Sequence, residues 1–211
     1  MYDWIVRIPV LLFSITIHEY AHGKVAYLLG DPTAKLAGRL TFNPFYHLDP
    51  VGAIMLFLFN FGWAKPVPVD PRYFRNIRRD IILMAAAGPA ANFFAAFVAG
   101  FFIRHLLFHN LLYQLVLIYL LFMNIGLGLF NLIPIPPLDG SHILENLLPV
   151  GASIRYQKLG RYGLALLFTI VLMDSFLHTR ILETLLLYPM FLIAKLFAGD
   201  NLIFLMHGIL R

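Results

Sequence analysis

The sequence predicts an all-α polytopic membrane protein, and two observations carry that prediction. Of 211 residues, 60% are hydrophobic and 13% are charged, whereas an ordinary soluble domain holds about 45–50% apolar and about 25% charged residues. Several apolar stretches also approach the roughly 20 residues that a helix needs to cross a bilayer. We expect one integral-membrane domain over residues 1–211, with a core at 4–140 and C-terminal helices at 160–198.

Five segments qualify as membrane spans by length and apolar character. The first has ionisable residues in its middle, unlike the apolar region of a cleavable signal peptide, so we expect it to remain in the mature protein. The last two are interrupted by Asp174, Glu183 and Lys195. The five predicted spans are residues 4–29, 81–103, 111–133, 162–177 and 181–198.

A short apolar stretch at 51–62 lies between the first two spans. As a helix it would rise about 18 Å, less than the roughly 30 Å hydrocarbon core, so it dips into the membrane and returns or packs against the other helices. A sixth span here would put the two basic connections on opposite sides of the membrane, which counts against it. Residues 39–43 alternate polar and apolar side chains, and residues 65–69 are typical of a proline-bearing edge strand. These two segments predict a small membrane-associated β element.

Basic residues set the expected orientation. Seven Lys and Arg lie in residues 30–80 and three in residues 140–161, with few in the other connections. By the positive-inside rule these loops are cytoplasmic, so a multi-pass protein of the cell membrane has its N-terminus outside and, after five spans, its C-terminus in the cytoplasm. The net charge of +5 then reflects contact with the lipid bilayer, and no nucleic acid is expected as a partner.

The strongest motif lies inside the first span. His18-Glu19-Tyr20-Ala21-His22 is an HExxH pattern, in which two imidazoles four residues apart share one helix face and can bind one zinc ion. Glu19 then lies within reach of a water bound to that zinc. Ionisable groups inside a span are costly and usually mark a functional site.

A catalytic zinc site needs a third protein ligand, and the absence of cysteine excludes a thiolate. Asp139 is the first candidate, because it follows prolines that end the third span and force the backbone to turn. His142, His47 and Asp49 remain alternatives.

Together, three motifs resemble the site-2 protease family of intramembrane zinc metalloproteases. They are HExxH at 18–22, GPxxN at 88–92 and the Asn-to-Asp-Gly segment at 131–140. GDPTAK at 30–35 and GWAKPVPV at 62–69 are similar to the compact prokaryotic branch without PDZ or CBS modules. The resemblance covers residues from about 5 to 160 and weakens beyond them.

The resemblance implies specific roles and partners. The substrate is a transmembrane protein cleaved in or near its spanning segment, with a regulatory membrane partner or a second copy of the chain as further partners. Glu19 is the catalytic acid/base. The ligands of one Zn²⁺ are His18, His22 and Asp139, and the candidate substrate-binding residues are Asn131 and Asn92.

Three other interpretations stay open. A membrane metal transporter could use the same His and Asp side chains as an ion pathway. A zinc enzyme of the other membrane type would take a glutamate as third ligand, for which Glu145 and Glu183 are available. Taken alone, Gly88-Pro89 indicates only a kink or a close helix contact, with Asn92 bonding across helices.

Overall fold

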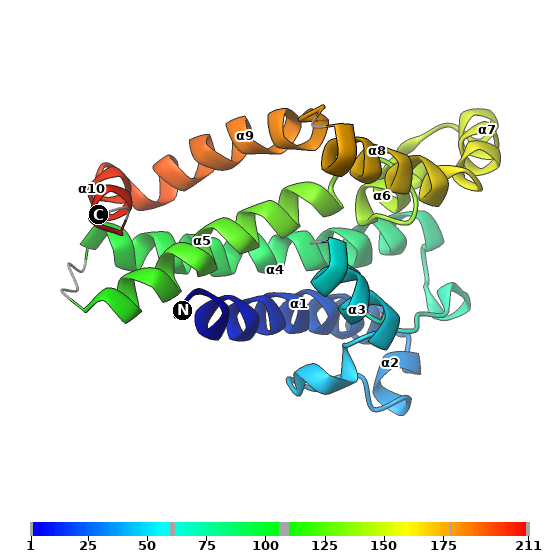
Figure 1. The fold of residues 1–211 in the computed structure, drawn as a ribbon. Helices are drawn as coiled ribbons and strands as arrows, with labels where there is room; N and C mark the ends of the chain where they lie inside the picture. The colour runs from blue at the N-terminus through cyan, green and yellow to red at the C-terminus, as the bar shows by residue number, and fades with distance from the viewer. Residues whose placement is uncertain (1, 60–61, 106–109, 178, 210–211) are drawn as a thin grey trace.

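Three long helices lie side by side and form the centre of the molecule (Figure 1). The computed structural model describes residues 2–59, 62–105, 110–177 and 179–209. The long helices are α1 (Tyr2–Leu28), α4 (Ile77–His105) and α5 (Leu111–Asn131). The shorter ones are α2 (Thr33–Leu36), α3 (Pro50–Phe59), α6 (Asp139–Leu147), α7 (Val150–Gly160), α8 (Gly163–Leu177), α9 (Ile181–Ala198) and α10 (Asn201–Ile209).

The three long helices are also the described helices that are long and apolar enough to cross a membrane. At about 1.5 Å per residue they are roughly 30–45 Å long, against a hydrocarbon core of about 30 Å. Predicted spans four and five correspond to α8 and α9, whose apolar parts, Gly163–Asp174 and Thr184–Ala198, are shorter. The predicted count of five spans is therefore not confirmed, and α3 is too short to supply a sixth.

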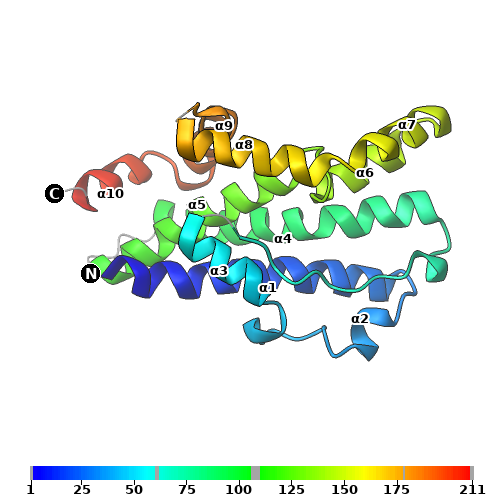
Figure 2. The ribbon, with the colours of Figure 1, turned by 45° about the vertical axis from the view of Figure 1, so that its right-hand side comes forward.

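The path of α8 and α9 differs from two separate crossings. Both views place the N- and C-termini at the same end of the long helices, and α8, α9 and α10 follow one another towards that end (Figures 1 and 2). Arg180, which precedes α9, has a left-handed backbone with φ 56° and ends the helical run there. Two helices of 15 and 18 residues thus share one traverse of the molecule, whereas five crossings would separate the termini.

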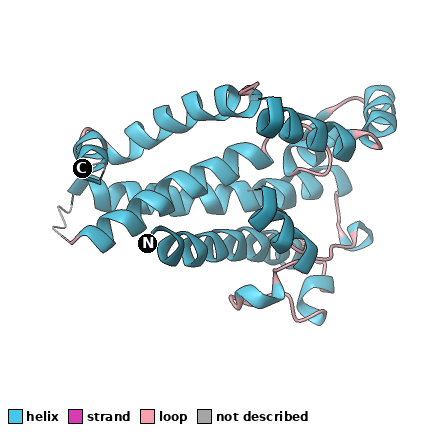
Figure 3. Ribbon diagram, in the orientation of Figure 1, coloured by secondary structure: helices cyan, strands magenta, loops and turns pink. Residues whose placement is uncertain are grey.

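The predicted β element is also not confirmed. All regular structure in the described residues is helical (Figure 3), apart from one isolated antiparallel bridge between Leu48 and Ala64. Beside it, Lys65 donates from its backbone N–H to the carbonyl of His47 at 2.9 Å. Prolines at 66 and 68 carry no N–H, so the extended segment 65–70 cannot continue a ladder.

The apolar core lies where α9 and α10 cover α4 and α5. Small residues on α4 and α9 let the helices approach closely, as is common between membrane helices. At Gly100 of α4, an added Cβ would lie 2.6 Å from the Cβ of Phe197 of α9. The buried core residues are Ala96, Ala99, Ile103, Leu121, Ile125, Ala194, Ala198, Leu202 and Leu205.

This contact predicts opposite effects for two helical glycines. Gly100→Ala should lower the thermal unfolding temperature of the detergent-solubilised protein, because overpacking typically costs about 1–3 kcal/mol. Gly126→Ala is the matched control: its new Cβ would meet only Met190 Sδ, at 3.7 Å. Alanine is better than glycine in a helix by about 1 kcal/mol, so this variant should be equally or more stable. A rise in unfolding temperature for Gly100→Ala would contradict the packing described.

Candidate metal centre

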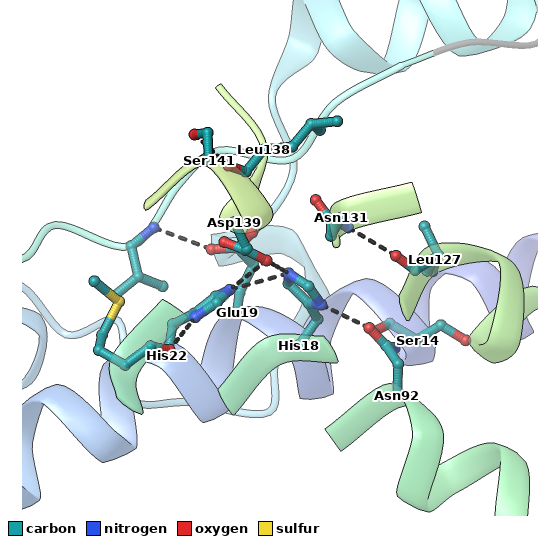
Figure 4. A network of polar contacts seen from close by, with 12 residues as sticks. Ser14, His18, Glu19, His22, Asn92, Leu127, Asn131, Leu138, Asp139 and Ser141 are labelled. Carbon is teal, nitrogen blue, oxygen red and sulfur yellow. Dashed lines mark hydrogen bonds and ion pairs between the residues drawn. The ribbon is translucent and has the colours of Figure 1, made fainter. Parts of the chain in front are cut away.

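Two helices bring three metal-ligand atoms together. His18 and His22 lie one turn apart on α1, and their Nε2 atoms are 3.0 Å from each other. Asp139, the first residue of α6, places Oδ2 3.1 Å from Nε2 of His18 and 3.3 Å from Nε2 of His22 (Figure 4). Both histidines are buried. Among the described residues, this is the group of three His, Cys, Asp or Glu side chains whose ligand atoms converge.

The Nδ1 atom of each histidine forms a hydrogen bond to an oxygen that can only accept. Nδ1 of His18 lies 2.6 Å from Oδ1 of Asn92, and Nδ1 of His22 lies 2.8 Å from the carbonyl of Met84. Each Nδ1 must therefore carry the proton, which leaves the lone pair of a neutral imidazole on Nε2. Such partners fix the tautomer and the ring orientation of metal-binding histidines.

Asn92 joins the three long helices in one buried network. Its Nδ2 donates to the carbonyl of Ser14 on α1 at 3.0 Å and to Oδ1 of Asn124 on α5 at 2.8 Å. Asn124 in turn donates to Oγ of Ser14 at 2.8 Å. None of the three side chains is exposed, and the amide assignment of Asn92 is fixed because both of its Nδ2 partners are acceptors. The network therefore fixes the His18 ring through Nδ1, the nitrogen that does not face Asp139.

A tight turn places Asp139. Prolines at 134, 136 and 137 prevent α5 from continuing, and Ser141 closes the start of α6 by donating from Oγ to the carbonyl of Leu138 at 2.6 Å. Gly140 lies against the end of α5, where an added Cβ would be 2.4 Å from the carbonyl carbon of Leu132. A glycine at 140 therefore allows the close approach that brings Asp139 to the histidines.

The three ligand atoms fit a zinc ion. With both Nδ1 atoms protonated, the Nε2 lone pairs face a carboxylate oxygen, and Oδ2 of Asp139 is buried without a hydrogen-bond donor. A cation between the three atoms would relieve this repulsion. Zinc bonds of about 2.0–2.1 Å in a tetrahedron separate ligands by roughly 3.3 Å, close to the distances found. Gly88 of α4 keeps this space free, since a Cβ there would lie 2.6 Å from Nε2 of His18.

The remaining predicted site residues lie nearby in different settings. Glu19 accepts a hydrogen bond at Oε2 from the backbone N–H of Val67, at 3.1 Å. Asn131 is half-buried at the end of α5 and donates from Nδ2 to the carbonyl of Leu127 in its own helix, at 3.0 Å. Asn92 uses its amide towards His18 and α5. The structure thus shows a positioning contact for Asn92, and substrate binding by Asn92 or Asn131 stays a prediction.

The alternative third ligands are engaged elsewhere. His47 bonds through Nε2 to the carbonyl of Thr41, Asp49 accepts from the N–H of Gly52 and His142 is exposed. Glu145 accepts from Gln157, and the side chain of Glu183 lies outside the described part of the chain.

Sequence reasoning missed several residues of the site. Ser14 lies four residues before His18 on the same helix face, and Asn124 is a polar residue inside an apolar span, so both could have been found by the patterns used above. The carbonyl of Met84 and the N–H of Val67 are backbone groups, and the sequence carries no local pattern for them.

A helical membrane protein with a buried two-histidine, one-aspartate group is the class that fold and site define. The family model described as Peptidase family M50 matches residues 104–173, which include Asn131 and Asp139. Two relatives carry the name "Putative zinc metalloprotease". YwhC of Bacillus subtilis (strain 168) is 44% identical over 163 residues, 72% of this chain and 74% of the relative. Rip2 of Mycobacterium tuberculosis (strain H37Rv) is 33% identical over 143 residues, 64% of this chain and 54% of Rip2.

No solved structure matches the chain. The similarity to YwhC extends over most of both proteins, and the family match falls on the segment that carries Asp139. The chain belongs to peptidase family M50, the site-2 protease family.

The hydrogen bond from His18 to Asn92 predicts a loss of metal affinity. Asn92→Ala should weaken zinc binding about 10- to 100-fold, as is typical when the partner of a metal-binding histidine is removed. Competition with a chromogenic chelator on the purified protein measures this affinity. Asn131→Ala is the control, because its amide bonds within α5, and it should bind zinc like the unsubstituted protein. Equal affinity of both variants would refute the role given to Asn92.

Proposed function

We propose that this protein is an intramembrane zinc metalloprotease that hydrolyses peptide bonds in or near the transmembrane segments of membrane proteins. One observation carries the proposal: two neutral imidazole Nε2 atoms and one carboxylate oxygen converge, buried, on a helix of membrane-spanning length. Membership of family M50 and the names of the relatives support a metalloprotease over metal transport.

His18, His22 and Asp139 would hold one Zn²⁺ per chain. Zinc in such a site polarises the scissile carbonyl and lowers the pKa of a water that it binds. Three protein ligands leave a fourth position open, as catalytic zinc sites require. Gly88 has no Cβ that would press on the Nε2 atoms of the two histidines, so α4 would not obstruct the ion there.

Glu19 acts as the acid/base of the reaction. Its carboxylate takes a proton from the attacking water and delivers it to the nitrogen of the leaving amine. The hydrogen bond from the N–H of Val67 to Oε2 of Glu19 orients the carboxylate during both transfers. Asn131, at the end of α5, would bind the substrate chain.

The bilayer sets further conditions on substrate and orientation. A helical substrate hides its carbonyls in intrahelical hydrogen bonds, so it must unwind locally before attack.

We propose that the N-terminus is outside and that the site opens to the cytoplasm, where the basic loops lie. Both termini lie at the same end of the long helices (Figure 1), so this proposal puts the C-terminus outside as well, in place of the cytoplasmic C-terminus expected from five spans. Residues 1–211 form one domain, regulated by a membrane partner or a second copy.

Glu19→Gln tests the chemical step. Glutamine keeps an oxygen that can accept the N–H of Val67, but it cannot take up a proton. Cleavage of a co-expressed transmembrane substrate should fall about 10²- to 10⁴-fold, while the zinc content of the purified protein stays unchanged. Asp49→Asn, which alters a carboxylate that caps α3, should leave cleavage intact. Undiminished cleavage by Glu19→Gln would remove Glu19 from the mechanism.

The ligand set has its own test. His18→Ala, His22→Ala and Asp139→Ala should each lose bound zinc, because two remaining ligands seldom hold the ion against buffer. Elemental analysis of the purified variants measures the loss. His142→Ala, at an exposed position next to the turn, is the control and should keep its zinc. Full retention of zinc by Asp139→Ala would move the third ligand to another residue, with His142 the next to examine.

A further inference from the structure

The extended segment 65–70 lies along α1 beside the site (Figure 2). It is fixed at its start by the N–H of Lys65, which donates to the carbonyl of His47. At its end the N–H of Asp70 donates to Oδ2 of the fully buried Asp31, at 2.7 Å. Between these anchors the N–H of Val67 donates to Glu19. The segment is therefore held at both ends and contacts Glu19 in the middle.

The sequence of this segment leaves a single donor opposite Glu19. Val67 stands between Pro66 and Pro68, and proline has no backbone N–H. Its side chain packs on the same helix: an added Cβ at Gly23, one turn beyond Glu19, would lie 3.0 Å from Cγ1 of Val67. A glycine at position 23 thus lets the segment approach α1 closely enough for the hydrogen bond to Glu19.

Arg39 holds the residues directly before Val67. Its Nη2 donates to the carbonyl of Lys65 at 2.6 Å and its Nη1 to the carbonyl of Pro66 at 3.2 Å. The side chain is 7% exposed, and the ion pairs found among the described residues do not include it. A buried cation is costly without a charged partner, so a guanidinium directed at two carbonyls indicates a specific requirement for those contacts.

Helix α2 fixes the position of Arg39 itself. The backbone N–H of Arg39 donates to the carbonyl of the fully buried Ala34, at 2.9 Å. Asp31, which anchors the far end of the segment, also caps the start of α2 through the N–H of Thr33 at 2.9 Å. One short helix therefore supports two of the contacts that hold segment 65–70, those from Arg39 and from Asp31.

We infer that Arg39 is a positioning residue for Glu19, acting through the backbone of Pro66 and Val67. Its fork binds the carbonyls of two successive peptide units, and the second unit carries the Val67 N–H that donates to the Glu19 carboxylate. The inference rests on the proposed function, because it gives Glu19 a geometry that proton transfer needs. Misplacement of a catalytic group by about 1 Å can cost about 100-fold in rate.

The first experiment separates turnover from binding. Arg39→Gln and Val67→Pro, which removes the N–H and also fixes φ, should each lower kcat about 10- to 100-fold on a purified transmembrane substrate. KM and zinc content should stay near those of the unsubstituted protein, since neither residue contacts the three ligand atoms. Val67→Ala keeps the N–H and should retain most of the activity.

Arg72→Gln is the matched control for loss of an arginine beside the same segment. The Arg72 guanidinium, which is exposed, hydrogen-bonds the Asp70 carboxylate and holds the pKa of that carboxyl below its usual range. An exposed pair of this kind contributes little to stability. Arg72→Gln should therefore leave kcat unchanged.

The second experiment does not depend on activity. The chain has no cysteine, so Val67→Cys supplies a unique thiol on the segment. Its rate of labelling by a maleimide reagent should rise about tenfold when Arg39→Gln is added, because an opened segment exposes the thiol, and should not change with Arg72→Gln. Equal labelling with and without Arg39→Gln would overturn the inference, whatever the activity.

Two further outcomes are distinguishable. If the segment opens in Arg39→Gln but kcat is unchanged, or if the loss comes from KM or from zinc, Arg39 does not position Glu19 and the inference fails. If the unsubstituted protein binds zinc but cleaves no membrane substrate, the proposed function fails, and the labelling rates still decide whether Arg39 holds the segment on α1.

Discussion

The hydrogen bond between Nδ1 of His18 and Oδ1 of Asn92 is the contact on which the rest of the site depends. It lies in a fully buried amide network that α1, α4 and α5 share. In a low-dielectric interior each of these bonds is strong, and each unpaired group would be expensive. The helices can therefore pack in one register, and in that register Nε2 of His18 points at Asp139.

The backbone N–H and C=O groups of the turn after α5 also need hydrogen-bond partners within the protein. Irregular backbone at membrane depth is tolerated only where protein covers it or a wet cavity borders it. Here the prolines carry no backbone N–H, and Ser141 Oγ donates to the carbonyl of Leu138. The backbone hydrogen bonds of α6 begin directly after the turn. Segment 65–70 follows the same rule. Its prolines reduce the number of N–H groups, Glu19 and Asp31 accept hydrogen bonds from two of those that remain, and Arg39 donates to two of its carbonyls.

Sequence reasoning reached the site more easily than the fold around it. The spacing of His18 and His22 on one helix, and the proline turn before Asp139, both follow from local geometry. The buried Asn92 was noticed, but its partner depends on how three helices pack, which no single segment encodes. The prediction of five spans counts α8 and α9 as separate membrane crossings. The break at Arg180 leaves each of these helices short, and the structure does not support that count. Alternation at 39–43 suggested a strand, yet the structure uses that stretch to carry Arg39 to a neighbouring loop.

The ligand atoms come from opposite halves of the chain. His18 and His22 lie on α1, whereas Asp139 follows α4 and α5 along the chain. Two imidazoles alone hold zinc weakly, and the metal affinity of such a site is part of its folding free energy. A nascent or truncated chain thus carries an incomplete centre. The three-ligand metal centre is therefore complete only after Asp139 has joined the two histidines.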